Sequence, residues 1–386
     1  MTKAEQTMTR IGQAFFYTAL VLEMLFVLLD KSEYIIPYET WFFRFTFFLF
    51  AVKIFCTKYT WKEWIVIFLM GILGVVSFVF SGREENVRIV AFLAAFKGID
   101  IKTAVKVTFF ETLSGCVVII LLALTGIYGT VSATGFFRGG GVEETRYCLG
   151  MGHPNALHCM FFVLLVLGMA LYLEKMKWYM YVLLHLMNFG MYLLTDSRTG
   201  MLMAAAAIFL AMFLQYAKRL REKKLLYILS ILFVVFLVLF TVFIGVYGVD
   251  IPILRQIDIR INGRFQWGKS EGGIQYWSLF SDPANQSYMD MGYMKLFYWY
   301  GIVPGLVYIT TVCLLIWNCY KRKLFDAFLV IMAFSAYTFI EAHVVSVFLG
   351  RNYILLFLGA VWYTVFTNNK EEKDFFHIYQ LFRDGV

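Results

Sequence analysis

The sequence lacks the short motifs that identify many soluble enzymes and metal-binding modules. Its six cysteines include no Cys-x-x-Cys pair, which argues against both a disulfide framework and a zinc site. No Gly-x-x-x-x-Gly-Lys-Ser/Thr loop occurs, so ATP hydrolysis at a P-loop is not expected. No Asp-x-Asp signature lies in a predicted outer loop, and we expect neither a metal nor another cofactor.

Charged residues are also scarce, at 16% of the 386 residues, whereas 61% are hydrophobic and 19% aromatic. The mean hydropathy of +0.71 is typical of a polytopic membrane protein. The apolar runs have helix length and do not alternate as barrel strands do. The first run follows a polar decapeptide without a small-residue cleavage site, so we expect it to remain as a membrane span.

We therefore predict an all-α integral membrane protein that forms one domain over residues 1–386, with about 12 transmembrane helices because roughly 20 apolar residues cross a bilayer. The fourth span is weak, since Arg83, Glu84, Glu85 and Arg88 crowd one end of it. The predicted spans are 11–29, 36–56, 64–80, 84–99, 104–125, 153–173, 178–195, 199–217, 225–247, 291–318, 325–345 and 347–366.

The distribution of basic residues predicts the orientation. With the N-terminus in the cytoplasm, inner segments hold 21 lysines and arginines and outer segments hold 10, as the positive-inside rule requires. Omitting the weak fourth span would place the basic stretches 218–224 and 321–323 outside. Both termini are then cytoplasmic, including a tail at 367–386. The net charge of +8 reflects this topology and gives no support to nucleic-acid binding.

Two long outer loops are predicted, at 126–152 and 248–290, and loops of this length in a compact protein are commonly functional. The first contains Arg146 near its end and leads into His153-Pro154-Asn155. Proline suits the first turn of a helix, so His153 is expected at the outer mouth of the sixth span. A helix N-terminus attracts anions, and an arginine can pair with two phosphate oxygens at once.

Three outward-facing helix N-termini carry such residues. Arg146 precedes the sixth span, Arg198 opens the eighth, and Arg264 lies in the loop before the tenth, near Asp290. We predict that these three arginines bind a diphosphate. Each residue also has a structural explanation: Arg198 as a membrane anchor, Arg146 and Arg264 as partners of loop carboxylates, and His153 and Asp290 as helix caps.

Glu341, near the outer end of the eleventh span, is a second candidate for chemistry. An ionisable group inside a membrane segment is a functional hypothesis by default, and a glutamate there can act as a general base. The sequence does not choose between His153 and Glu341 as the base, and Asp290 is the next candidate. Trp267, Trp277 and Tyr293 are predicted to contact glycan, with interfacial anchoring as the alternative. His158 is expected to form structural hydrogen bonds.

In this order the motifs resemble the O-antigen polymerase and ligase superfamily of membrane glycan-assembling enzymes. The resemblance covers about 138–355 and favours the polymerases. It rests on Gly150-Met-Gly-His-Pro-Asn155 after Arg146, Thr195-Asp-Ser-Arg-Thr-Gly200, Gly263-Arg-Phe-Gln-Trp267, Asp290-Met-Gly-Tyr293 and Tyr300-Gly-Ile302.

The resemblance implies a glycosyltransferase-C-like fold in the bacterial cytoplasmic membrane, with the active site facing outside. The implied reaction transfers a growing undecaprenyl-diphosphate-linked polysaccharide onto the sugar end of an incoming lipid-linked repeat unit. The product would be capsule, exopolysaccharide or O-antigen. A flippase and a chain-length regulator would be partners. Membrane lipid would surround the protein, and nucleic acid would play no part.

Three alternatives remain. A ligase that transfers finished glycan is less favoured, because the loop between the last two spans is short and no Gly/Thr-rich motif follows His343. A flippase for lipid-linked oligosaccharides would place its polar residues near the membrane midplane, whereas here they gather at predicted outer ends. A purely structural partner in a glycan-assembly complex would tolerate single arginine changes.

Overall fold

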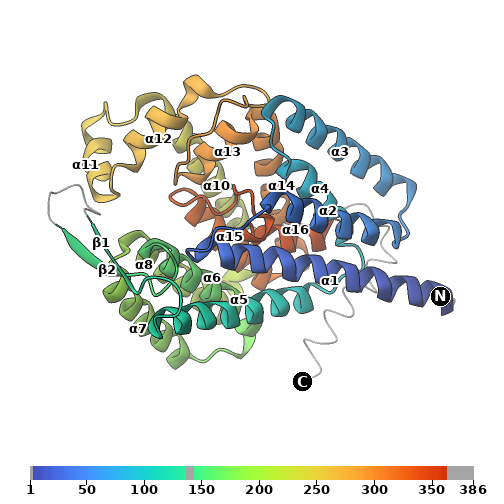
Figure 1. Cartoon of the computed structure of the whole chain (residues 1–386), viewed down its shortest axis with the longest axis horizontal. Helices are drawn as coiled ribbons and strands as arrows, with labels where there is room; N and C mark the ends of the chain where they lie inside the picture. The colour runs from blue at the N-terminus through green and yellow to red at the C-terminus, as the bar shows by residue number, and fades with distance from the viewer. Residues whose placement is uncertain (1–2, 136–142, 363–386) are drawn as a thin grey trace.

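The computed structural model describes residues 3–135 and 143–362, and within them the chain is almost entirely α-helical (Figure 1). The predicted cytoplasmic tail at 367–386 lies outside the described residues. The first half of the chain contains α1 (Lys3–Lys31), α2 (Glu39–Phe55), α3 (Trp61–Ser81), α4 (Glu85–Ala95), α5 (Ile101–Leu124), α6 (Pro154–Tyr172), the 3-10 turn η1 (Leu173–Lys175) and α7 (Trp178–Thr195). The second half contains α8 (Arg198–Tyr216), α9 (Lys218–Arg221), α10 (Lys224–Tyr247), α11 (Pro252–Arg260), α12 (Arg264–Gly272), η2 (Ile274–Tyr276), α13 (Gly292–Tyr300), α14 (Ile302–Arg322), α15 (Phe325–Thr338), η3 (Leu349–Arg351) and α16 (Ile354–Trp362).

Seven helices of the described chain are long and apolar enough to cross a membrane. They are α1, α3, α5, α6 with η1, α8, α10 and α14. Helix α3 exposes large apolar side chains such as Phe68, Leu69 and Val79, an arrangement suited to lipid rather than to water. The other predicted spans coincide with helices that are shorter or less apolar. Twelve crossings and a glycosyltransferase-C-like arrangement therefore stay predictions.

The predicted span at 291–318 is two helices, because the chain breaks at Gly301. Gly301 has φ of 92°, and a Cβ atom there would lie 2.5 Å from the Cα of Phe280. The preceding loop crosses this point and accepts hydrogen bonds from α14, from the Ile302 N–H to the Ser278 carbonyl at 2.9 Å and from Val303 to Leu279 at 3.0 Å. The loop thus satisfies helix N–H groups that would otherwise lack partners.

The C-terminal part of the bundle departs from the predicted spans in a second place. Helix α15 ends at Thr338, and residues 339–353 contain no α-helix, only η3. Helix α16 begins at Ile354. The predicted span 325–345 is therefore a shorter helix, and within the predicted span 347–366 the helix begins only at Ile354.

Both predicted outer loops contain secondary structure. In the first, β1 (Ser132–Gly135) pairs with β2 (Glu144–Tyr147) in antiparallel register, with Ala133 opposite Arg146. The second folds into α11, α12 and η2, with Pro252 at the first turn of α11. The described parts of both loops thus pair some of their backbone N–H and C=O groups within the protein.

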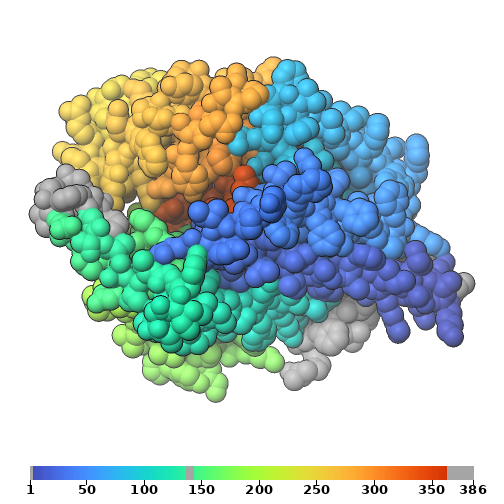
Figure 2. All heavy atoms as spheres, viewed as in Figure 1, coloured from blue at the N-terminus to red at the C-terminus, as the bar shows by residue number. Residues whose placement is uncertain are grey.

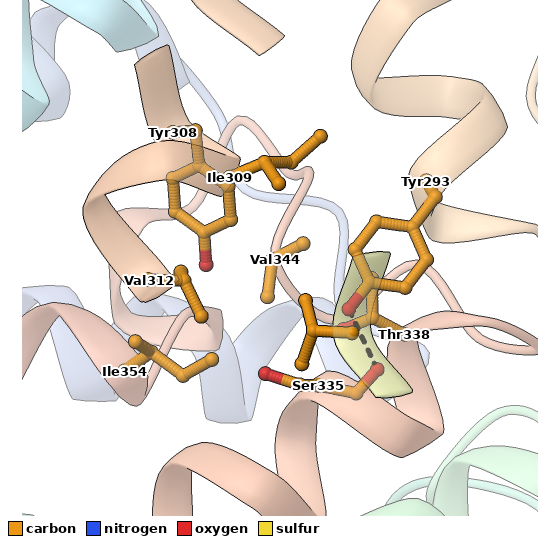
Figure 3. Close-up of a pocket in the computed structure, with 9 residues that line it drawn as sticks. Tyr293, Tyr308, Ile309, Val312, Ser335, Thr338, Val344 and Ile354 are labelled. Carbon is orange, nitrogen blue, oxygen red and sulfur yellow. Dashed lines mark hydrogen bonds between the residues drawn. The ribbon is translucent and has the colours of Figure 1, made fainter. Parts of the chain in front are cut away.

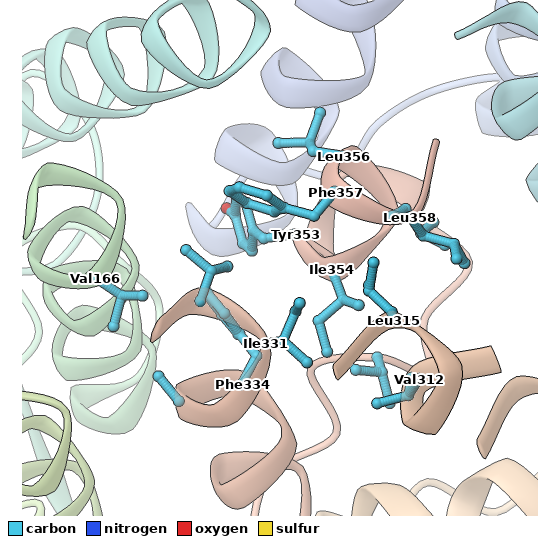
Figure 4. Close-up of a cluster of buried hydrophobic side chains, with 14 of the residues drawn as sticks. Val166, Val312, Leu315, Ile331, Phe334, Tyr353, Ile354, Leu356, Phe357 and Leu358 are labelled. Atoms are coloured by element: carbon cyan, nitrogen blue, oxygen red, sulfur yellow. The ribbon is translucent and has the colours of Figure 1, made fainter. Parts of the chain in front are cut away.

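The core lies around α13, α15 and α16, in which nearly every side chain is buried. All nine residues of α16 are buried. Side chains from α14 and α15 lie against α16, and side chains of α6 lie against α15; they include Val166, Leu315, Phe334 and Phe357 (Figure 4). Because the surrounding helices cover α15 and α16, these two short helices and the irregular segment between them are enclosed by protein.

Candidate functional site

Three residues distant in sequence meet at the start of α12. Arg264 Nη2 lies 2.6 Å from Glu341 Oε1 and 3.0 Å from Asp290 Oδ2. Arg264 Nη1 also donates to the carbonyl of Ile340 at 3.1 Å. The guanidinium therefore holds two carboxylates and the backbone of the segment that follows α15.

Local sequence explains how these residues approach one another. Gly263, with φ of 76°, begins α12, and Asp258 Oδ1 accepts the Phe265 N–H at 2.7 Å. Gly292 follows Asp290 closely, and a Cβ at this glycine would lie 2.7 Å from the Thr338 carbonyl. Only glycine allows α13 to approach the end of α15 this closely, so it brings Asp290 beside Glu341.

The Arg264 side chain is only 7% exposed. Burial disfavours the charged guanidinium, but the carboxylates of Glu341 and Asp290 outweigh that effect, so the pKa of Arg264 lies above its ordinary value. The cluster of Arg264, Asp290 and Glu341 carries one positive and two negative charges. It is consequently suited to accepting a proton or a hydroxyl donor rather than to binding an anion.

His153 lies close to this cluster and caps α6. Its Nδ1 accepts the Asn155 N–H at 3.1 Å, and Pro154 occupies the first turn. Burial lowers the pKa of His153; Asp290 opposes the shift, whereas Arg146, Arg264 and Lys31 add to it. The neutral imidazole therefore carries its proton on Nε2, since Nδ1 is the acceptor. In this state His153 donates a hydrogen bond and has no nitrogen ready to remove a proton.

Arg146 is buried on β2. It forms ion pairs with Glu144 Oε2 at 2.5 Å and with Asp196 Oδ2 at 3.2 Å. Asp196 occupies the left-handed region, with φ of 49°, between α7 and α8. Arg146 thereby ties the hairpin to the α7–α8 turn.

The Thr195-Asp-Ser-Arg-Thr-Gly200 motif serves mainly to pack helices. His158 is buried, with Nδ1 2.9 Å from Thr195 Oγ1 and Nε2 3.2 Å from Asn188 Oδ1, the structural role expected from the sequence. A Cβ at Gly200 would lie 2.7 Å from the His158 ring. Arg198 is exposed, and it has no ion pair with the described residues.

The three predicted glycan contacts lie in different environments. Trp267 is 44% exposed and is available to a sugar. Trp277 donates from Nε1 to the Gly272 carbonyl at 2.8 Å and packs against Phe297. Tyr293 is 3% exposed and donates to the Ser335 carbonyl at 2.9 Å. The interior placement of Tyr293 does not favour its predicted contact with glycan.

Tyr293 lines a small internal gap together with Tyr308, Val312 and Ile354 (Figure 3). The gap has no room for a water molecule. Its lining is apolar apart from a few hydroxyl groups, so it is a packing defect and not a substrate site.

Several charged residues near the Arg264 cluster were not selected from the sequence. Asp30 Oδ2 lies 3.2 Å from Lys31 Nζ and 3.8 Å from Arg351 Nη1. Lys295 is fully buried on α13. Lys295 and Arg351 lie within or at the rim of predicted spans, and that position was the available signal. In Figure 2, atoms of the red C-terminal part are visible at the bottom of a depression between the blue N-terminal helices and the orange loop.

Comparison with protein-family models, with curated proteins and with solved structures finds no match to this chain. Within residues 3–135 and 143–362, no group of three or more histidine, cysteine, aspartate or glutamate side chains is placed to hold a metal ion.

Proposed function

We propose that the chain is a membrane glycan polymerase of the kind its motifs resemble. It would act at the outer face of a bacterial cytoplasmic membrane, with both termini inside. The observation that carries the proposal is the meeting of Arg264, Asp290 and Glu341 beside His153. His153, Arg264 and Asp290 lie in motifs that carry the resemblance, and Glu341 comes from a fourth part of the chain. Together they supply a held carboxylate next to a hydrogen-bond donor.

The reaction requires one proton acceptor and one stabilised leaving group. The hydroxyl on the acceptor sugar attacks the anomeric carbon of the growing glycan. A new C–O bond forms as the bond to the lipid diphosphate breaks, and the diphosphate leaves with the electron pair. The hydroxyl proton passes to a carboxylate, for which we assign Glu341, because a general base must be held within hydrogen-bond reach of the hydroxyl.

Glu341 is the better-oriented carboxylate. Arg264 contacts both its Oε1 atom and the carbonyl of the preceding residue, Ile340, whereas Asp290 has a single contact with the same guanidinium. His153 is assigned to donate from Nε2 to a sugar or phosphate oxygen, since its Nδ1 is occupied by the helix cap. Arg264 then positions the base.

The direct test is polymer formation from purified lipid-linked repeat units by the full chain in lipid nanodiscs. Arg264→Lys should lower the rate about 100-fold or more, because a lysine lacks the planar fork and displacement of a catalytic group by about 1 Å costs that much. Lys269→Ala is the matched control. Lys269 is a cation of the same loop that pairs with Asp250 at 2.7 Å, and its loss should leave the rate within about twofold of wild type.

Two results would reject this function. Repeat units that are moved across the bilayer but never joined would indicate a lipid-linked oligosaccharide flippase. Transfer of finished glycan to a different acceptor lipid, without polymer growth, would indicate a ligase. An Arg264→Lys variant with the wild-type rate would leave polymerisation possible but would remove Arg264 from the site.

A further inference from the structure

A group of three cations lies beside the Arg264 cluster and has too few carboxylates to neutralise it. Lys31 Nζ lies 3.2 Å from Asp30 Oδ2, and Arg351 Nη1 lies 3.8 Å from the same oxygen. Lys295 forms no ion pair and no side-chain hydrogen bond with any described residue, yet it is 0% exposed. With both lysines protonated, the group of Lys31, Lys295 and Arg351 with Asp30 carries a net charge of two positive units.

Lys295 is the unusual member. Its Nζ lies 3.6 Å from the centre of the Tyr288 ring and 3.7 Å from that of Trp299. Aromatic faces attract an ammonium group only modestly, and a buried charge without a partner is strongly unfavourable. Such a residue is explained when a bound anion supplies the missing partner.

The three cations are connected through Tyr288. Arg351 interacts with the Tyr288 side chain, whose ring covers Lys295. Tyr288 is itself 45% exposed, so the group lies one side chain beneath the surface. Tyr288 is also two residues from Asp290, which contacts Arg264. An anion held by these cations would therefore lie next to the proposed base.

We propose that Lys31, Lys295 and Arg351 form the subsite for the diphosphate of the polyprenyl-linked substrate. The inference rests on the proposed function and moves the diphosphate away from Arg264, where the sequence placed it. A diphosphate esterified at both ends carries two negative charges, which match the net charge of the cation group. Around Arg264, by contrast, two carboxylates would repel it.

The test uses the full chain in nanodiscs of phosphatidylcholine, with farnesyl diphosphate as a soluble polyprenyl diphosphate and farnesol as the uncharged control. Calorimetry should detect binding of farnesyl diphosphate but not of farnesol. Lys295→Met and Arg351→Gln should each weaken binding about 10- to 100-fold, the effect of losing a hydrogen bond to a charged group. Arg264→Lys and Lys269→Ala should bind as wild type does.

A thermal scan separates a binding role from a structural one. Lys295→Met should unfold at the wild-type temperature or above without ligand, because an unpaired buried charge has been removed. Farnesyl diphosphate should raise the unfolding temperature of wild type but not of this variant. Should Lys295→Met fail to fold, Lys31→Gln, at the end of α1, must show the same loss of binding.

The outcomes distinguish the subsite from the proposed function. Wild-type chain that does not bind farnesyl diphosphate, or Lys295→Met that binds it normally, overturns the subsite even if polymer forms. Loss of binding in Arg264→Lys instead would return the diphosphate to Arg264. Displacement of the probe by phosphatidylglycerol in mixed nanodiscs would mean that a phospholipid head group is the ligand, which also overturns it. Binding as expected without any polymer would retain the subsite and reject the polymerase.

Discussion

Replacing Glu341 by glutamine separates the chemical role of this residue from its structural one. The carboxylate accepts from Arg264 Nη2 at 2.6 Å, and Asp290 lies 3.0 Å from the same nitrogen. An amide has the same shape and retains an acceptor oxygen. Asp290 would still balance the charge of Arg264.

The expected cost to folding is therefore small. A hydrogen bond between charged groups contributes about 1.5–3 kcal/mol and one with a neutral partner about 0.5–1.5 kcal/mol. Glu341→Gln should then reduce the free energy of unfolding by about 1 kcal/mol. The rate of polymer formation should fall far more, by about 100- to 10,000-fold, because an amide cannot take the hydroxyl proton.

The assay compares initial rates of polymer formation at saturating lipid-linked repeat units, with unfolding temperatures measured on the same preparations. His153→Asn is the companion variant, since asparagine preserves the helix cap, and it should lose no more than about 10-fold. The reasoning is refuted if Glu341→Gln retains the wild-type rate. If His153→Asn is the inactive variant, His153 is the base; if neither is, Asp290→Asn becomes the decisive test.

Three further predictions concern stability. Arg88→Met should destabilise the fold by about 3–5 kcal/mol, because it leaves the Glu23 carboxylate buried without its ion-pair partner. The double variant that combines Glu23→Met with Arg88→Met should be destabilised less than Arg88→Met alone. Chemical denaturation measures both. Gly301→Ala should cost at least about 1–3 kcal/mol from its positive φ, with a lowered unfolding temperature; an unchanged one would contradict the close approach of Phe280. The pKa of His153 is lowered in the folded state. Its contribution to the free energy of unfolding is therefore present above the unfolded-state pKa of about 6.5 and is lost as the pH falls below that value. Between pH 7.5 and 5.5 the unfolding temperature should drop less in His153→Asn than in wild type.

Hydrophobic length predicted most of the helical segments, because the burial of an apolar run and the capping of its ends are both determined within a few turns of chain. Thr60, for example, caps α3 with a reciprocal contact to Glu63, and Asp100 caps α5. The break at Gly301 was missed because its cause is the loop at 278–281, which reaches the helix only in the folded protein. Apolar composition continues unchanged across that glycine.

The weak fourth span shows that the environment of a charged residue can also depend on a contact with a distant part of the chain. Arg88 is one of the charges that weaken the predicted fourth span, yet it is 3% exposed and pairs with Glu23 at 3.1 Å. Thr46 also donates to Glu23, at 2.7 Å. A charged residue in a short apolar run has two explanations, a surface loop or a buried partner, and the partner was 65 residues away in the sequence.

For the candidate site, the sequence selected residues that do converge, since His153, Arg264, Asp290 and Glu341 lie together. The sequence did not predict which of these charged side chains would form ion pairs with one another. Arg264 was expected to face a diphosphate because its carboxylate partners were unknown. Lys295 was not selected from the sequence, and only the structure shows that it is buried without an ion pair to any carboxylate of the described residues.

The irregular segment at 339–353 links the fold to the site. A backbone without regular hydrogen bonds is tolerated at membrane depth only where protein covers it. Here arginines satisfy part of that backbone: Arg264 donates to the Ile340 carbonyl at 3.1 Å, and Arg88 donates to that of Val347 at 2.7 Å. Asn352 Nδ2 also donates a longer hydrogen bond, of 3.4 Å, to the Val344 carbonyl. The same segment carries both Glu341, the proposed base, and Arg351, a member of the proposed diphosphate subsite. A continuous helix from α15 to α16 would direct successive side chains around its circumference, whereas the break allows both residues to face Tyr288 and Asp290. The positions of the proposed base and of the proposed diphosphate subsite are therefore set by where α15 ends.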